Sequence, residues 1–176
     1  GTVIRGNVAR DNGQSPFARE HWQLGLYLDE GSAGMLVENN VVFRVGTHGF
    51  NMNGGADNLI RNNILGPVYG NHAPYLRCHR NAFARSNTFS RNIAWCDSPM
   101  LGDDAWPVGL FRCSSNVYWN LTGSNFSLRG KSYGDWHTGE QDVGSVLADP
   151  LFKDPQRMDY SLKPGSPVLK LGFMPF

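Results

Sequence analysis

The sequence predicts an all-β domain built as a parallel β-helix, in which short strands stack coil upon coil. Three observations carry this prediction. An Asn-containing segment recurs along the chain, a segment with alternating apolar residues repeats 24 residues later, and the 21 glycines, together with many asparagines, imply recurring turns. No window shows the 3.6-residue apolar period of a long amphipathic helix.

The recurring segment has one template: an apolar residue, two polar residues, Asn, and then Val or Ile. Its copies are Ile4–Val8, Val37–Val41, Ile60–Ile64, Phe89–Ile93 and Cys113–Val117. Asn tolerates the left-handed conformation at a bend, and stacked Asn amides can hydrogen-bond to one another. We therefore expect Asn7, Asn40, Asn63, Asn92 and Asn116 to form a ladder, with the flanking apolar residues inside the coils.

Unrelated Asn-rich hairpin turns are the alternative interpretation of the same segments. Hairpin turns favour Asn-Gly at their tips, whereas here a β-branched residue follows each Asn. The template therefore favours stacked coils.

A second repeat aligns Gly25–Gly31 with Gly49–Gly55. Strand residues alternate between two faces, so Leu26 over Phe50 and Leu28 over Met52 are expected to point inward. The alternation then places a polar row on the solvent face of the same strands. This row consists of Tyr27, Asp29, Asn51 and Asn53.

These motifs carry a resemblance. Leu26–Gly31, Glu38–Val42, Gly46–Phe50 and Asp57–Ile64 resemble segments of the right-handed parallel β-helix (pectin-lyase-like) proteins of bacterial carbohydrate metabolism, and Ala148–Phe152 with Asp159–Pro167 look like their closing segment. The resemblance covers about residues 1–65 and 143–174. It implies a right-handed solenoid, relatives among glycoside hydrolases and polysaccharide lyases, and an extracellular or periplasmic location.

The domain organisation follows from these segments. Residues 1–144 are expected to form the coils, and residues 145–176 an irregular C-terminal capping tail of the same domain. Proline donates no ladder hydrogen bond, and five of the ten prolines lie in that tail. Because Gly1 opens directly onto the first repeat and solenoids need capped ends, further coils are expected before it.

Composition excludes several partners. Charged residues make up 18% of the chain, the net charge is +1, and no basic stripe is present, so nucleic acid is not expected. No apolar stretch approaches the roughly 20 residues that cross a bilayer. Cys78, Cys96 and Cys113 form no CxxC pair and are expected to be buried thiols.

Glycosidic cleavage usually requires two carboxyl groups, and groups on neighbouring strands lie about 4.8 Å apart. The catalytic candidates are Asp29, which ends an outward-facing strand, Glu30 beside it, and Asp57 after the next corner. Asp beside Gly also commonly stabilises a turn, which is the alternative role for each.

The candidate substrate-binding residues are aromatic, polar or basic side chains near this row. They are Trp22, Tyr27, His48, Asn51, Asn53, His72 and Arg77. Aromatic rings stack on sugars, and cations neutralise uronate carboxylates. Trp22 could equally cover the core, His48 could be a structural corner residue, and the basic cluster around Arg77 could be a solvated loop.

No cofactor is predicted. Asp29, Glu30 and Asp57 could offer oxygen ligands to Ca²⁺, but their spacing matches no calcium loop, so no metal is assigned. The expected function is a glycoside hydrolase acting on a polysaccharide or oligosaccharide, with a polysaccharide lyase or a non-catalytic glycan-binding β-helix as alternatives. Carboxylates capped by backbone amides would favour the non-catalytic alternative.

Overall fold

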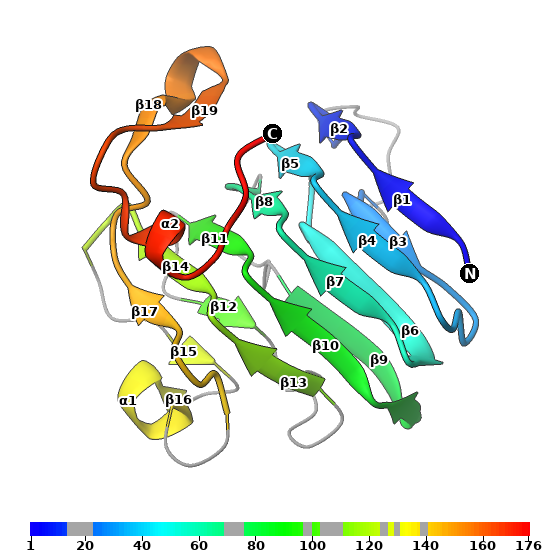
Figure 1. Cartoon of the computed structure of the whole chain (residues 1–176). Helices are drawn as coiled ribbons and strands as arrows, with labels where there is room; N and C mark the ends of the chain where they lie inside the picture. Colours follow the sequence, from blue (N-terminus) through cyan, green and yellow to red (C-terminus); the bar gives the residue numbers. More distant parts are fainter. Residues whose placement is uncertain are drawn as a thin grey trace.

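A computed structural model of the chain describes residues 1–13, 23–68, 76–96, 100–102, 111–123, 127–128, 131–137 and 141–176. The described residues form an all-β structure dominated by parallel sheets (Figure 1). Helical structure in them is limited to α1 (Tyr133–Trp136), α2 (Pro167–Lys170) and a 3-10 turn, η1 (Pro155–Arg157). None of these helices is long and apolar enough to cross a membrane.

Three sheets contain most of the strands. Sheet A contains β1 (Val3–Arg5), β4 (Leu36–Glu38), β7 (Leu59–Arg61), β10 (Asn87–Ser90) and β13 (Phe111–Ser114) in that order. Sheet B contains β2 (Val8–Arg10), β5 (Val41–Phe43), β8 (Ile64–Leu65), β11 (Ile93–Cys96), β14 (Val117–Asn120) and β17 (Val146–Leu147). Sheet C contains β3 (Leu26–Leu28), β6 (Phe50–Ala56), β9 (Leu76–Arg85), β12 (Met100–Gly102), β15 (Ser127–Leu128) and β16 (Lys131–Ser132).

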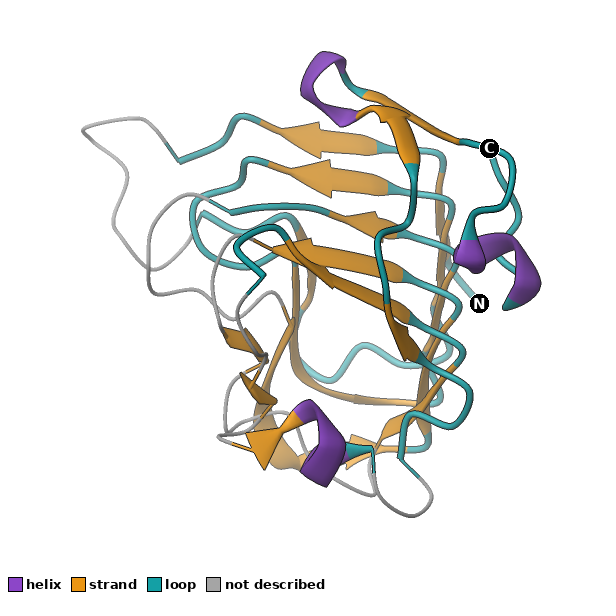
Figure 2. Ribbon diagram, turned by 90° about the vertical axis from the view of Figure 1, so that its left-hand side faces the viewer, coloured by secondary structure: helices purple, strands orange, loops and turns teal. Residues whose placement is uncertain are grey.

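The chain visits the three sheets in turn. It runs from β1 in sheet A to β2 in sheet B and β3 in sheet C, and returns to sheet A at β4 beside β1. Paired strands within the three sheets are parallel, apart from β15 and β16. Successive circuits therefore stack, as Figure 2 shows, which is consistent with a β-solenoid.

The predicted Asn ladder is confirmed at the corner between sheets A and B. Nδ2 of Asn7, Asn40 and Asn63 each donates to Oδ1 of the next ladder Asn at 2.9 Å, and Nδ2 of Asn92 donates to Oδ1 of Asn116 at 3.3 Å. The left-handed residue is not the ladder Asn, as the template suggested, but the residue before it. These residues are Gly6, Asn39, Asn62, Arg91 and Ser115, with φ between 52° and 70°.

A second, shorter ladder was not predicted. At the corner between sheets C and A, Asn58 Nδ2 donates to Asn87 Oδ1 at 3.0 Å. The residues before them, Asp57 and Ser86, have φ of 56° and 53°. Both corners thus use one left-handed residue followed by an Asn, which is buried at every position except Asn7.

The interior prediction is half right. Ile4, Val37, Ile60, Phe89 and Cys113 stack in register and belong to or pack against the main core, in which all three cysteines are buried thiols. The residues after each Asn were also expected inside, but Ile64, Ile93 and Val117 belong to a separate cluster outside sheet B, and Val8 is 63% exposed. The buried Asn itself takes the inward position, so alternation turns the next residue outward.

The C-terminal tail covers this outer cluster. The antiparallel strands β18 (Phe152–Asp154) and β19 (Asp159–Leu162), together with α2, bring Phe152, Val168 and Phe173 against the outer face of sheet B (Figure 1). The tail therefore packs along a side of the stack. Leu169 on α2 is 42% exposed and does not belong to this cluster.

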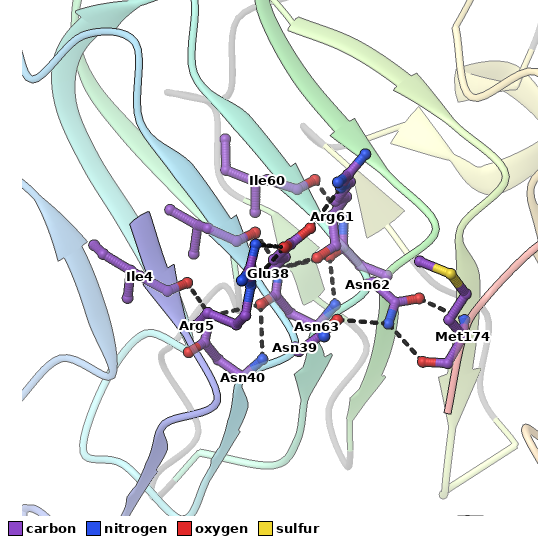
Figure 3. Close-up of polar contacts among 12 residues, drawn as sticks. Ile4, Arg5, Glu38, Asn39, Asn40, Ile60, Arg61, Asn62, Asn63 and Met174 are labelled. Carbon is purple, nitrogen blue, oxygen red and sulfur yellow. Dashed lines mark hydrogen bonds and ion pairs between the residues drawn. The ribbon is translucent and has the colours of Figure 1, made fainter. Parts of the chain in front are cut away.

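Asn62 fixes the end of the tail. Its Oδ1 accepts from the Met174 N–H at 2.7 Å, and its Nδ2 donates to the Met174 carbonyl at 2.6 Å (Figure 3). The same Nδ2 donates to Oδ1 of Asn39 at 2.8 Å. Asn62, hydrogen-bonded to Asn39, thus connects the corner between sheets A and B to Met174, which is distant in the sequence.

Candidate functional site

The candidate site lies on sheet C, where the predicted register is confirmed. Leu26 pairs with Phe50, Tyr27 with Asn51, and Leu28 with Met52. Leu28, Phe50 and Met52 are buried in the core. Tyr27, between the two leucines, belongs to the opposite face of the strand. The row that contains Tyr27 and Asn51 continues to Arg77 in β9.

A hydrogen-bonded cluster lies where β3 ends, beside the middle of β6. Oδ1 of Asp29 accepts from the Tyr27 hydroxyl at 2.7 Å and from Nδ2 of Asn53, on the neighbouring strand, at 2.9 Å. It also accepts from the backbone N–H of Glu30 at 2.8 Å. Three donors from two coils therefore converge on one oxygen of an exposed carboxylate.

The same Asp29 also begins a turn. Its carbonyl accepts from the Ser32 N–H at 3.1 Å and from the Ser32 hydroxyl at 2.6 Å, and Glu30 adopts a left-handed conformation with φ of 48°. The Glu30 N–H on the carboxylate is the backbone cap that favours a structural role. The contacts from Tyr27 and Asn53 are additional to the turn.

The Tyr27 hydroxyl remains protonated near neutral pH. Burial of the side chain, followed by the hydrogen bond to Asp29, raises the pKa of Tyr27 to about 12. Tyr27 therefore acts as a neutral donor to the carboxylate.

Asn51 was expected to face solvent, and the structure corrects this. Its exposed fraction is 2%, and that of His48 is 5%. Outward alternation sets the direction of a side chain but not its accessibility, which depends on what packs above the strand. Oδ1 of Asn51 and the hydroxyl of Thr47 are buried without a hydrogen-bond partner among the described residues. Such atoms are rare in folded proteins and commonly mark water or ligand positions.

The remaining candidates are less closely grouped. Asp57 is exposed at the next corner, where its N–H donates to the Arg85 carbonyl at 3.1 Å. Arg77 is partly buried in β9. Trp22 and His72 lie outside the described residues. The structure thus brings together Tyr27, Asp29, Asn53 and the backbone of Glu30.

Thr47 was missed by the sequence analysis. It precedes His48 in the turn before β6, and the only local signal was its position beside a histidine already chosen.

Within the described part of the chain, no group of three or more His, Cys, Asp or Glu side chains could hold a metal ion. Comparisons with models of known protein families, with curated proteins and with solved structures find no match to this chain.

Proposed function

We propose that the chain is a right-handed parallel β-helix of the pectin-lyase-like type that binds a polysaccharide or oligosaccharide on the outer face of sheet C and acts as a glycoside hydrolase. One observation carries the proposal: Oδ1 of the exposed Asp29 accepts hydrogen bonds from Tyr27, Glu30 and Asn53. The turn that begins at Asp29 requires only the hydrogen bond from the Glu30 backbone N–H to this carboxylate. The side-chain donors from two strands form a polar surface suited to sugar hydroxyls.

The chemistry follows from these contacts. Hydrogen bonds to a carboxylate favour its ionised form, so Asp29 suits the nucleophile or base rather than the acid. Glu30 and Asp57 are the candidate proton donors. Separations of about 5 to 5.5 Å between the two carboxyl groups lead to retention, and about 6.5 to 9.5 Å to inversion. Asn53 would then orient both Asp29 and a sugar hydroxyl.

A non-catalytic glycan-binding β-helix is the second candidate. The Glu30 N–H caps the carboxylate of Asp29, and Ser32 donates to its backbone carbonyl, so Asp29 has a structural role in the turn without catalysis. A polysaccharide lyase, which needs a base and a cation beside a uronate, would instead depend on Arg77, one position along the row from Asn51.

The test is Asp29→Asn, with Asp159→Asn as its matched control. Asp159 is an exposed aspartate on β19 whose Oδ1 also accepts from a backbone N–H and a hydroxyl, both of Ser161. Binding is measured by calorimetry on an oligosaccharide panel, hydrolysis by reducing-end release, and lyase activity by absorbance of the unsaturated product.

For a hydrolase, Asp29→Asn lowers cleavage at least about 100-fold and Asp159→Asn leaves it unchanged. Binding by the parent protein without cleavage, lost in Asp29→Asn, would establish the non-catalytic candidate. If cleavage and affinity are both unchanged in Asp29→Asn, the site assignment is wrong.

A further inference from the structure

A pocket of about 490 Å³ lies away from the candidate glycan face, between the outer face of sheet B and the hairpin of β18 and β19. Phe43, Trp95 and Trp119 line it from the sheet, and Pro155 and Tyr160 from the tail. Its volume falls within the roughly 300 to 1,000 Å³ of small-molecule sites.

The stacked coils build the aromatic wall. Trp95 pairs with Trp119, and Phe43 and Gly66 occupy the corresponding outward positions on β5 and just after β8. A Cβ on Gly66 would lie 2.7 Å from Nε1 of Trp95 and 2.9 Å from Cβ of Phe43. The missing side chain therefore allows the Trp95 indole to lean over Gly66 towards Phe43.

The faces of the aromatic rings that line the pocket are partly covered by neighbouring groups. Trp95 and Trp119 stack at 5.6 Å with an interplanar angle of 16°, and the Arg44 guanidinium lies 4.9 Å from the centre of the Phe43 ring. Tyr160 meets Trp95 at 65° and Phe43 at 57°. Ring edges therefore contribute strongly to the lining, and aromatic edges carry partial positive charge.

The indole nitrogen of Trp95 is packed inside the wall, against Gly66, and is not on the surface of the pocket. Trp95 is 7% exposed, and its Nε1 is buried without a hydrogen-bond partner among the described residues.

Two arginines share one aspartate beside the rim of the pocket. Arg44 pairs with Asp11 through Nε to Oδ1 at 2.7 Å and Nη2 to Oδ2 at 2.9 Å. Asp11 also pairs with Nη1 of Arg10 at 3.4 Å, so this group keeps one excess positive charge, which disfavours a cationic ligand. A pyranose ring stacks on an open aromatic face, whereas an electron-rich aromatic ring complements positive ring edges.

We infer that this pocket is a second binding site, one that takes a compact, phenol-like aromatic ring. The inference does not rest on the proposed glycan function, because it uses another sheet and other residues. Phenol is the probe, and cyclohexanol, of similar size and also bearing a hydroxyl, is its matched control without an aromatic face.

The binding experiment is a ligand-observed NMR titration of the protein. Phenol is expected to bind with a Kd on the order of 1 mM, a value reasonable for so small a ligand. Cyclohexanol should bind at least about 10-fold more weakly, and intermolecular nuclear Overhauser effects should connect phenol with the indoles of Trp95 and Trp119. Equal binding of the two probes, or no effect at these indoles, would overturn the inference.

A pair of variants tests the location. Leu121 lines the pocket and is 45% exposed, so Leu121→Trp should occlude the pocket and weaken phenol binding at least about 10-fold with little change in Tm. Leu169, 42% exposed on α2 and not part of the lining, gives the control Leu169→Trp, which should bind as the parent does.

If Leu121→Trp binds phenol as tightly as the parent, the pocket is not the site. Should that variant unfold, the Overhauser contacts in the parent protein decide the question. Cellobiose is included as a neutral saccharide, and displacement of phenol by cellobiose would assign the pocket to sugars and overturn the inference.

Discussion

Asn63→Ala removes the middle member of the Asn ladder. The side chain makes five hydrogen bonds: Oδ1 accepts from N and Nδ2 of Asn40, and Nδ2 donates to the carbonyls of Val37 and Arg61 and to Oδ1 of Asn92. Asn63 is 0% exposed, so water cannot replace these partners without entering the stack.

The cost follows from the groups left behind. The buried N–H of Asn40 loses its acceptor, which costs about 1 to 3 kcal/mol, whereas Nδ2 of Asn40 keeps its hydrogen bond to the Ile4 carbonyl at 3.0 Å. The other lost hydrogen bonds each contribute about 0.5 to 1.5 kcal/mol and are partly compensated. Asn63→Ala should therefore lower the free energy of unfolding by about 3 kcal/mol.

Asn7→Ala is the matched control, because Asn7 is an exposed member of the same ladder. Its Nδ2 donates to Asn40 Oδ1 at 2.9 Å, but that oxygen also accepts from the Asn7 N–H, which the variant keeps. A loss below about 1 kcal/mol is expected, measured by urea unfolding followed by circular dichroism. If Asn63→Ala and Asn7→Ala are equally stable, the buried ladder is not a stabilising feature and the reasoning is refuted.

Two further predictions concern Asp142, near the last coil, and the C-terminal tail. Asp142 is 0% exposed and accepts hydrogen bonds from Asn116, Tyr118, Trp136 and Ser145. Asp142→Ala should therefore lower the free energy of unfolding, measured in urea, by about 4 kcal/mol. A loss below about 1 kcal/mol would contradict a stabilising role of this carboxylate. Deleting residues 149–176 uncovers the outer apolar face of sheet B, so the truncated chain should aggregate, which size-exclusion chromatography would detect. A truncated chain that stays monomeric and unfolds cooperatively would contradict the covering role of the tail.

The ladder and the strand register could be predicted because stacking places like residues over like. Asn63 lies over Asn40 and Phe50 over Leu26, so spacing in the sequence becomes contact in space. The shorter ladder could not be predicted because its two members have different sequence neighbours. Asp57 and Leu59 flank Asn58, whereas Ser86 and Thr88 flank Asn87. A repeat with two dissimilar copies gives no periodic signal.

The candidate site could be predicted only in part. Strand alternation identified Tyr27, Asp29 and Asn53 as an outward group, and the structure joins them by hydrogen bonds. Burial of Asn51 depends on packing over the sheet, and the aromatic pocket depends on Tyr160 reaching within 5.4 Å of Phe43, ring centre to ring centre. Neither follows from local pattern, because contacts between distant segments decide both.

Glu38 gives the chain a pH-dependent stability on the outer face of sheet A. Its Oε2 accepts from Nε of Arg61 and its Oε1 from Nε of Arg5, both at 2.7 Å (Figure 3). The hydrogen bond from Arg61, followed by that from Arg5, holds the pKa of this carboxyl below its usual value of 4.5 despite burial, which acts in the opposite direction.

A carboxyl with a lower pKa in the folded than in the unfolded chain stabilises the fold above the unfolded pKa, and this contribution disappears as the pH falls through the folded pKa. Glu38→Gln should therefore cost about 2 kcal/mol near neutral pH, where the variant leaves two guanidinium groups without their carboxylate. The difference between parent and variant should shrink steadily as the solution is acidified below about pH 4, because the parent carboxyl then also becomes neutral. Other acidic groups titrate in both proteins and cancel in this difference. A difference in urea unfolding that stays constant from neutral to acid pH would show that Glu38 stabilises sheet A through packing and not through its charge.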